Sequence, residues 1–480
     1  MAVPLRRQVV SALVAVSSWQ LLAAAAAIAG NVLLARLLGP RLLGAYAVAA
    51  FFLGLLALII DFGIGTALIR RKGSEDPVFT STALAFTLLL TLGTGLAVLI
   101  AAPWVSSWYG DRAVGDLLRL CFPGVAIASV FRLSQSLLEK EMRYREVAAT
   151  EALGTAAFYG VAGALAAAGL GVAALAGGEL SRGLTGLLAF HRRPFPVRFQ
   201  WSRTALRELV AFGGPYLGSV LTWNLTGAVN AVVVARVAGL EAAGVVRIAE
   251  GLVNQLTLFK RIGERIATPV IARLQANRRR VVRAIEIGQT VQFLLGALPL
   301  LAFTVVGGVV IPWAYGPRWA PVASLLPLLS LAVAVNAAFG LHSRALVTVG
   351  RNKDVLVFHV AYAALQLGTA PLWVTRWGTI GYGLAALAPI PSYLVVHHAF
   401  VRAFGPLDYL PLARLLVPSC LAMTAAWAIG RPLLGLALFG VVLGTLLVVE
   451  SRAIRLLCRL LRAQRLDDSA LPTPVRSRVE

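Results

Sequence analysis

Long apolar stretches separated by short polar breaks run along the chain from Ser11 to Val449. A helix needs about 20 apolar residues to cross the hydrocarbon core of a membrane, and the stretches reach that length. The pattern predicts an all-α polytopic membrane protein with about fourteen spans. The predicted spans are residues 12–35, 43–67, 80–103, 117–138, 148–168, 171–190, 209–235, 243–262, 288–312, 320–345, 354–374, 378–400, 410–429 and 432–450.

Composition agrees with a membrane protein and narrows the function. The 480 residues are 59% hydrophobic and only 14% charged, so lipid has to act as the solvent. The sequence contains no GxxxxGK[ST] phosphate loop and no HExxH or CxxC metal spacing. Because no long loop is left for a catalytic domain, we expect no enzyme activity, no catalytic residues, no metal and no cofactor.

Basic residues mark alternate loops. The net charge of +23 would suggest nucleic acid in a soluble protein, but in membrane proteins Lys and Arg gather on the cytoplasmic side. About three quarters of the 44 basic residues fall on one side of the predicted topology. This distribution predicts an even number of spans with both termini in the cytoplasm, and no nucleic-acid partner.

An internal repeat indicates how the spans are grouped. Val32, Ala35, Arg36, Gly39 and Gly44 recur 200 residues later as Val232, Ala235, Arg236, Gly239 and Gly244. Since six predicted spans separate the copies, both halves have the same orientation and form a parallel repeat. The predicted domains are an N-terminal six-helix lobe (1–195), a C-terminal six-helix lobe (196–405), two accessory spans (406–450) and a cytoplasmic basic amphipathic tail (451–480).

Ionisable residues within the spans are the candidates for function, because a charge at membrane depth needs a partner or a water-filled cavity. Arg132 has no acidic residue within one turn of its helix and is the best candidate for binding an anionic group. Asp61 and Glu151 are candidate carboxylates.

Other charged residues in the spans have a structural alternative. Glu179 with Arg182, and Arg247 with Glu250, are spaced to pair on one helix face. Arg36 and Arg236 occupy equivalent repeat positions, where they either contact a ligand or extend to the outer interface.

The sequence also resembles a known family. The resemblance runs from Leu34-Ala35-Arg36-Leu37-Leu38-Gly39-Pro40 through Asp61-Phe62-Gly63 and Leu138-Glu139-Lys140 to Pro269-Val270-Ile271-Ala272-Arg273. These segments are similar to the polysaccharide and O-antigen flippases of the multidrug/oligosaccharidyl-lipid/polysaccharide exporter superfamily.

The resemblance implies two lobes around a cavity in the bacterial inner membrane. The implied cargo is a polyprenyl-diphosphate-linked oligosaccharide, carried to the outer leaflet for surface polysaccharide export, with membrane lipids and the polysaccharide polymerase and chain-length machinery as partners. Arg132, Arg36, Arg236 and Arg247 would then contact the diphosphate or sugar, and Asp61, Glu151 and Glu250 would couple transport to an ion gradient.

Three alternatives remain open from the sequence. A multidrug or small-cation exporter of the same superfamily should expose more carboxylates at membrane depth than this chain does. A peptidoglycan-precursor flippase would carry the same polyprenyl diphosphate with a different sugar. A membrane scaffold without transport would tolerate a neutral residue at Arg132.

Overall fold

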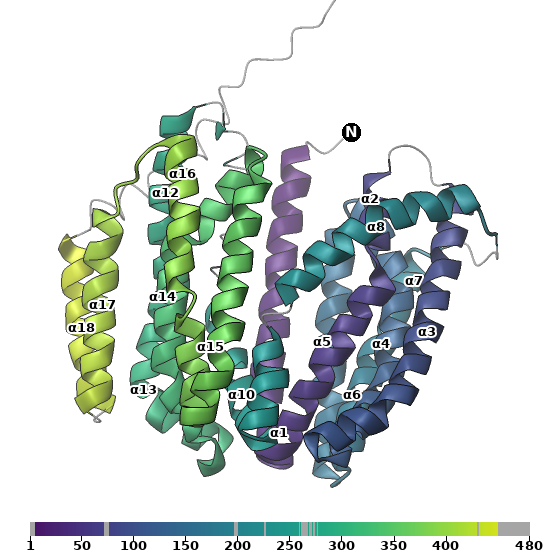
Figure 1. Ribbon diagram of the computed structural model, residues 1–480, viewed down its shortest axis with the longest axis horizontal. Coiled ribbons are helices and arrows are strands. Elements are labelled where there is room, and N and C mark those ends of the chain that lie inside the picture. Colours follow the sequence, from purple (N-terminus) through teal and green to yellow (C-terminus); the bar gives the residue numbers. More distant parts are fainter. Residues whose placement is uncertain are drawn as a thin grey trace, which may run out of the picture. The chain divides into compact units, whose positions relative to one another are not determined.

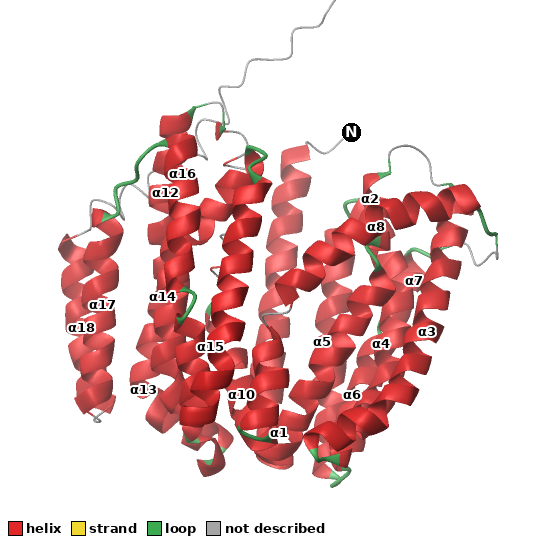
Figure 2. Cartoon of the chain, viewed as in Figure 1, coloured by secondary structure: helices red, strands yellow, loops and turns green. Residues whose placement is uncertain are grey.

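The computed structural model describes residues 5–71, 76–195, 200–224, 227–258, 260, 267, 271, 274–275, 277–429 and 432–449, and these residues form helices and turns with no strand among them (Figure 2). Seven helical stretches of this described chain are long and apolar enough to cross a membrane. Two of them, Ser18–Arg70 and Asn352–Phe404, have 53 residues each and contain backbone breaks at Gly39 and Gly378. The predicted helical membrane fold is confirmed, and the number fourteen stays a prediction.

The chain divides into two compact units. Unit 1 comprises Met1–Gln255, Val310–Leu328 and His359–Pro389, and unit 2 comprises Leu256–Val309, Leu329–Phe358 and Ile390–Glu480. The predicted repeat lobes stay a prediction, and the predicted tail at 451–480 lies outside the described residues.

The helices follow one another as drawn in Figure 1. The first half of the chain contains α1 (Leu5–Asp61), α2 (Ile64–Arg70), α3 (Pro77–Tyr109), α4 (Arg112–Lys140), α5 (Tyr144–Ala167), α6 (Gly171–Leu184), α7 (Gly186–Arg192), α8 (Arg203–Asn224), the π-helix η2 (Val229–Val234), α9 (Ala235–Val237) and α10 (Leu240–Leu256). The second half contains α12 (Arg278–Gln292), η3 (Phe293–Ala297), α13 (Leu298–Tyr315), η4 (Pro317–Trp319), α14 (Pro321–Thr348), α15 (Asn352–Leu387), η5 (Ile390–Ser392), α16 (Tyr393–Phe404), α17 (Leu410–Ile429) and α18 (Pro432–Val449).

Several predicted spans are interrupted in the structure, among them 43–67, 171–190 and 378–400. The span expected at 43–67 ends at Asp61, because Phe62 and Gly63 adopt positive φ angles of 45° and 72° before α2 begins. The span expected at 378–400 breaks after Leu387, where Pro389 and Pro391 lack the amide hydrogens that a continuing helix requires. The first interruption matters for function, because it ends α1 at a carboxylate.

The repeated glycines bring α1 and α10 together within unit 1. A methyl group added to Gly44 would lie 1.7 Å from the carbonyl oxygen of Leu240, and one added to Gly244 would lie 2.1 Å from that of Pro40. Gly44 therefore packs on Leu240, four residues before Gly244, and Gly244 packs on Pro40, four residues before Gly44. Small residues allow such close backbone approach between membrane helices.

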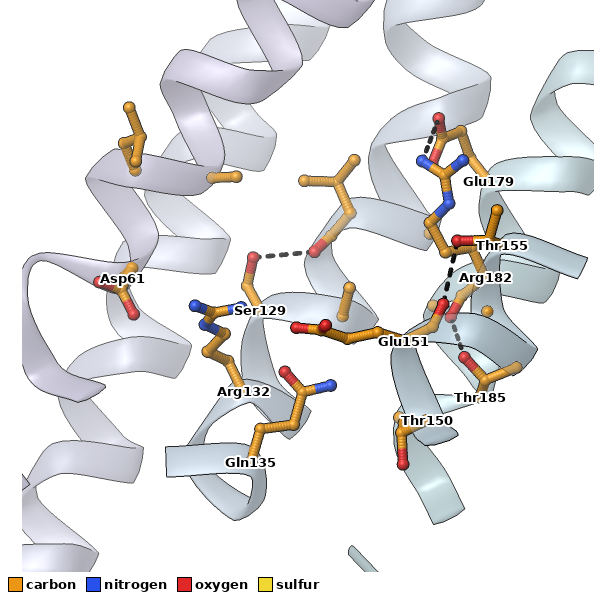
Figure 3. Close-up of a pocket in the computed structure, with 18 of the residues that line it drawn as sticks. Asp61, Ser129, Arg132, Gln135, Thr150, Glu151, Thr155, Glu179, Arg182 and Thr185 are labelled. Atoms are coloured by element: carbon orange, nitrogen blue, oxygen red, sulfur yellow. Dashed lines mark hydrogen bonds and ion pairs between the residues drawn. The ribbon is translucent and has the colours of Figure 1, made fainter. Parts of the chain in front are cut away.

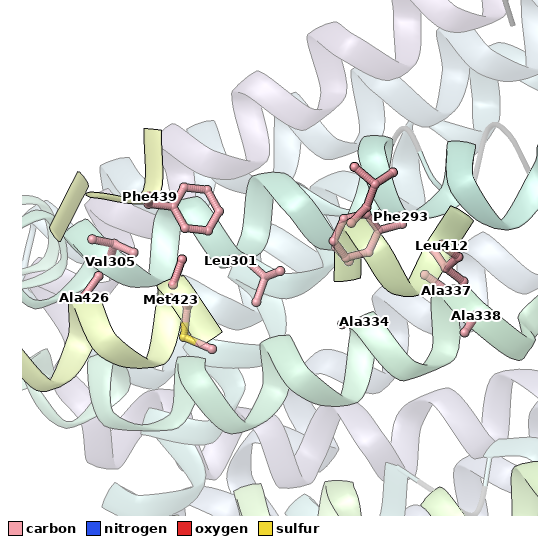
Figure 4. Packing of buried hydrophobic residues seen from close by; sticks show 13 residues of the cluster. Phe293, Leu301, Val305, Ala334, Ala337, Ala338, Leu412, Met423, Ala426 and Phe439 are labelled. Carbon is pink, nitrogen blue, oxygen red and sulfur yellow. The ribbon is translucent and has the colours of Figure 1, made fainter. Parts of the chain in front are cut away.

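Unit 2 has a continuous apolar core. Phe293, Leu301, Met423 and Phe439 belong to one buried cluster that joins η3 and α13 to α14, α17 and α18 (Figure 4). Phe293 is completely inaccessible to solvent. Close side-chain packing of this kind holds membrane helices together where no water is available to drive their association.

Candidate functional site

A cavity of about 740 Å³ opens within unit 1. Its walls are formed by α1, α4, α5, α6, α7 and the loop between α6 and α7, with Tyr216 added from α8. The volume falls in the range of small-molecule binding sites, about 300–1,000 Å³. The charged and polar side chains of the wall that Figure 3 labels are Asp61, Ser129, Arg132, Gln135, Thr150, Glu151, Thr155, Glu179, Arg182 and Thr185. Tyr216 also lines the cavity.

Arg132 places a positive charge in this wall. It lies on α4, roughly two turns before the helix ends at Lys140, and its backbone carbonyl accepts a hydrogen bond from the Ser136 hydroxyl at 3.0 Å. Within the described part of the chain, the guanidinium makes no hydrogen bond and no ion pair. Its five donors are therefore available to an anion that enters the cavity.

Two carboxylates share the cavity with Arg132. In the view of Figure 3 the Arg132 guanidinium is drawn between Asp61 and Glu151. Asp61 closes α1 and accepts a hydrogen bond from the Gly63 amide at 3.2 Å, so the break at Phe62 and Gly63 fixes its position. Glu151 lies on α5 and is exposed.

A second arginine lines the cavity but already has a partner. The Arg182 Nη1 atom lies 3.4 Å from each carboxylate oxygen of Glu179, which confirms the pairing that their spacing predicts. The Tyr46 hydroxyl also donates to Glu179, and the Arg182 guanidinium lies 4.2 Å above the centre of the Phe158 ring. Sequence reasoning did not find Tyr46, because an uncharged side chain gives no signal of its contact with a helix 133 residues away.

The remaining candidate arginines do not line this cavity. Arg36 donates to the backbone carbonyls of Trp313 at 2.5 Å and Ala314 at 2.6 Å. Arg236 is exposed. Arg247 lies 4.5 Å above the centre of the Tyr46 ring and lines a separate small cavity of about 20 Å³.

Glu250 is also held elsewhere in unit 1. It accepts hydrogen bonds from Tyr382 at 2.5 Å and from Asn230 at 3.4 Å. In the described chain no ion pair joins Glu250 to Arg247. The structure thus brings together Arg132, Asp61 and Glu151, and places the other four candidates apart from them.

The turn between α4 and α5 carries a network of ion pairs next to the cavity helices. Glu141 accepts from Arg143 at 3.0 Å and from Arg193 at 2.5 Å, and Arg143 also pairs with Glu146 at 2.6 Å. Partial burial would raise the pKa of Glu141, but the hydrogen bonds from Arg143 and Arg193 outweigh burial and lower that pKa. The network fixes the end of α4 relative to α5 and α7.

Comparison with known proteins places the chain among polysaccharide biosynthesis proteins. The sequence model of a family described as "Polysaccharide biosynthesis protein" matches residues 33–324, more than half of the chain. Teichuronic acid biosynthesis protein TuaB of Bacillus subtilis is 23% identical over 65% of this chain and 67% of its own length. Amylovoran biosynthesis protein AmsL of Erwinia amylovora is 26% identical over 70% of this chain and 88% of its own.

A third relative and two solved structures complete the comparison. Succinoglycan biosynthesis transport protein ExoT of Rhizobium meliloti is 26% identical, and the match spans 62% of this chain and 61% of that protein. The lipid II flippase MurJ in an inward closed conformation superposes with a TM-score of 0.74 at 12% identity, covering 92% of this chain and 99% of MurJ. An inward-facing multidrug resistance MATE transporter of the MOP superfamily gives 0.61 at 18% identity, covering 79% and 93%. At these identities the superpositions establish the fold alone, and they agree with the predicted all-helical membrane fold.

Proposed function

This chain belongs to the polysaccharide biosynthesis protein family, and from that membership we propose that it is a flippase for a polyprenyl-diphosphate-linked oligosaccharide. The cargo would move from the inner to the outer leaflet of the bacterial inner membrane, for export of a surface polysaccharide. The observation that carries the proposal is Arg132, a guanidinium that forms no hydrogen bond or ion pair within the described chain and lines a cavity of about 740 Å³.

The physical argument concerns the diphosphate. Its negative charge loses hydration when it leaves the water at the membrane surface, and the loss is expensive unless fixed cations replace the water. A guanidinium offers paired N–H donors that match phosphate oxygens. Arg132 can therefore hold the head group while the polyprenyl chain stays in the lipid.

Transport itself would follow alternating access. In this proposal the predicted lobes, 1–195 and 196–405, rock around the cargo, and the repeat supplies the symmetry that such movement uses. Asp61 and Glu151 are the proposed ion-coupling carboxylates, because they line the same cavity as Arg132. Protonation of Asp61 or Glu151 would remove a negative charge that attracts Arg132 to the wall, and Arg132 would then bind the cargo more strongly.

A small-cation exporter is the second candidate, and one observation favours it. The cavity wall contains three carboxylates, Asp61, Glu151 and Glu179, against two arginines, Arg132 and Arg182. Such a wall could attract a cationic drug when Asp61 and Glu151 are ionised. The exporter would need these carboxylates and would not need Arg132.

The test compares Arg132→Gln with Arg119→Gln, which removes a charge from α4 about 20 Å away along the helix at a residue outside the cavity wall. Each variant replaces the wild-type gene in the host. Polyprenyl-diphosphate oligosaccharides are then quantified by mass spectrometry after labelling that is selective for one leaflet. We expect Arg132→Gln to accumulate cargo facing the cytoplasm at normal protein abundance, and Arg119→Gln to behave as wild type.

A parallel assay measures ethidium efflux from proteoliposomes. If Asp61→Asn abolishes efflux of this cation while Arg132→Gln leaves both efflux and surface polysaccharide intact, the exporter is correct and the flippase is wrong.

A further inference from the structure

Arg182 is held in the cavity wall by long polar contacts. Its two hydrogen bonds to Glu179 are 3.4 Å long, whereas the ion pairs of Arg41 with Asp111 and of Arg143 with Glu146 are 2.9 and 2.6 Å. Hydrogen bonds of 3.4 Å lie at the long edge of the useful range. The Arg182 side chain is 41% exposed although that of Glu179 is only 10% exposed.

Glu179 does not depend on Arg182 alone. The Tyr46 hydroxyl donates to the same carboxylate, and both Tyr46 and Glu179 are buried. A buried carboxylate without any donor would be strongly destabilised. With Tyr46 in place, Glu179 keeps a donor even when Arg182 turns toward another anion.

Phe158 supports the arginine without competing for its donors. Its ring is 2% exposed and lies 6.1 Å from the Tyr46 ring in a stacked arrangement. The Arg182 guanidinium sits 4.2 Å above the Phe158 ring, a cation–π contact that positions the charge and uses none of the N–H groups at the guanidinium edge.

From these contacts we propose that Arg182 is a second anion-binding residue of the cavity, and that Tyr46 is the positioning residue that lets Arg182 exchange Glu179 for the cargo. The proposal rests on the flippase function and names the chemistry that the site selects. Arg132 on α4 binds one phosphate and Arg182 on α6 binds the other. A lipid diphosphate is therefore preferred over a lipid monophosphate.

The first experiment measures binding to the full chain in lipid nanodiscs, with farnesyl diphosphate and farnesyl monophosphate as probes. Loss of a charge-assisted hydrogen bond weakens binding by about tenfold or more. We expect Arg182→Gln to weaken diphosphate binding by about that factor and to leave monophosphate binding within about twofold. Arg132→Gln should weaken binding of both probes, and Arg119→Gln should change neither.

The second experiment tests the exchange by a double-mutant cycle. Tyr46→Phe removes the hydroxyl that satisfies Glu179, so the carboxylate should hold Arg182 and weaken diphosphate binding by roughly threefold to tenfold. Glu179→Gln should bind the diphosphate at least as tightly as wild type. In the Glu179→Gln background, Tyr46→Phe should have no further effect, because no carboxylate remains to compete for Arg182.

Several results would overturn the proposal. Equal loss from Tyr46→Phe in both backgrounds would show that Tyr46 only supports packing. Unchanged diphosphate binding in Arg182→Gln would remove Arg182 from the site, and the flippase function would still stand if Arg132→Gln loses binding. Wild-type binding in both arginine variants would reject the whole cavity.

The test of Arg182 does not depend on the folding of Arg182→Gln alone. If Arg182→Gln fails to fold, Arg182→Lys takes its place, because lysine keeps the charge and loses the planar fork. We expect Arg182→Lys to reduce the preference for diphosphate over monophosphate by about threefold. An unchanged preference in this variant would count against the proposal.

Discussion

In unit 1, the Arg132 guanidinium faces a cavity of about 740 Å³ and makes no hydrogen bond or ion pair within the described chain. In unit 2, by contrast, His342 is completely buried and both of its ring nitrogens have hydrogen-bond partners. The His342 Nε2 atom lies 2.8 Å from the Tyr409 hydroxyl, its Nδ1 lies 3.1 Å from the Phe339 carbonyl, and the same hydroxyl lies 2.8 Å from His397 Nδ1.

The difference extends to the neighbouring polar groups. In unit 2, Lys260 donates to Asn336, which donates in turn to the Tyr393 hydroxyl at 2.8 Å. The side chains of these two groups, His342 with its neighbours and Lys260 with Asn336 and Tyr393, satisfy one another, as buried groups must. Arg132, Asp61 and Glu151 do not, and this contrast teaches that the cavity of unit 1 keeps charges available for a ligand, while these clusters of unit 2 use their polar groups for structure.

The largest expected effect concerns packing. Phe293→Ala should lower the free energy of unfolding by about 3 kcal/mol or more, because it leaves a cavity in the buried cluster of unit 2. Val125→Ala is a smaller truncation in unit 1, of a side chain that already faces the cavity, and it should cost much less on both grounds. Thermal unfolding in detergent checks both variants. Equal destabilisation would mean that the unit 1 cavity is closed and packed in solution.

The next effect concerns the buried histidine. His342→Leu keeps a similar volume but leaves the Tyr409 hydroxyl without one of its partners, so it should destabilise the protein by about 1–3 kcal/mol. His398→Leu is the control, because His398 lies exposed on the same helix as His397. If both leucine variants unfold at the wild-type temperature, the polar cluster does not stabilise unit 2.

Arg132 should show the opposite behaviour from His342. Arg132→Gln removes a charge that makes no hydrogen bond or ion pair in the described residues, so the stability of the variant should stay within about 0.5 kcal/mol of wild type or rise, while transport is lost. Functional sites commonly reduce stability in this way. A clear loss of stability in Arg132→Gln would assign the residue to structure, and its effect on transport would then be indirect.

The sequence predicted the helices better than the connections between them. The span expected at 410–429 coincides with α17, because a long apolar run between polar residues leaves little freedom in its limits. The break after Leu387 was missed, although Pro389 and Pro391 could have signalled it. Apolar composition alone does not register a backbone interruption inside an apolar run.

The site was predictable in part for a similar reason. Charged residues at membrane depth are conspicuous, so Arg132, Asp61 and Glu151 could be selected as candidates from the sequence. Their convergence on one cavity required the structure, since they come from three helices. Tyr46 was out of reach, because its partner Glu179 lies 133 residues away and the contact leaves no periodic pattern.

The smallest effect lies at the α4–α5 turn, a charged part of unit 1 whose groups, unlike Arg132, are paired. Glu141→Gln should lower the melting temperature slightly at neutral pH, because partly exposed ion pairs contribute only about 0.2–1 kcal/mol each. The folded protein lowers the pKa of Glu141, so its stabilisation is present above the ordinary glutamate pKa of about 4.3 and is lost as the pH falls through the lowered value. The gap between wild type and variant should therefore close in acid.

Glu208→Gln is the control for this pH dependence, since Glu208 is exposed on α8 and forms no polar side-chain contact in the described chain. Its melting curve should follow wild type at every pH. A gap for Glu141→Gln that persists unchanged in acid would show that the loss comes from packing and not from ion pairing. In that case Glu141 would stabilise the turn by packing, as Phe293 stabilises the core of unit 2. Arg132, Asp61 and Glu151 in the cavity would then be the charges whose role is functional and not structural.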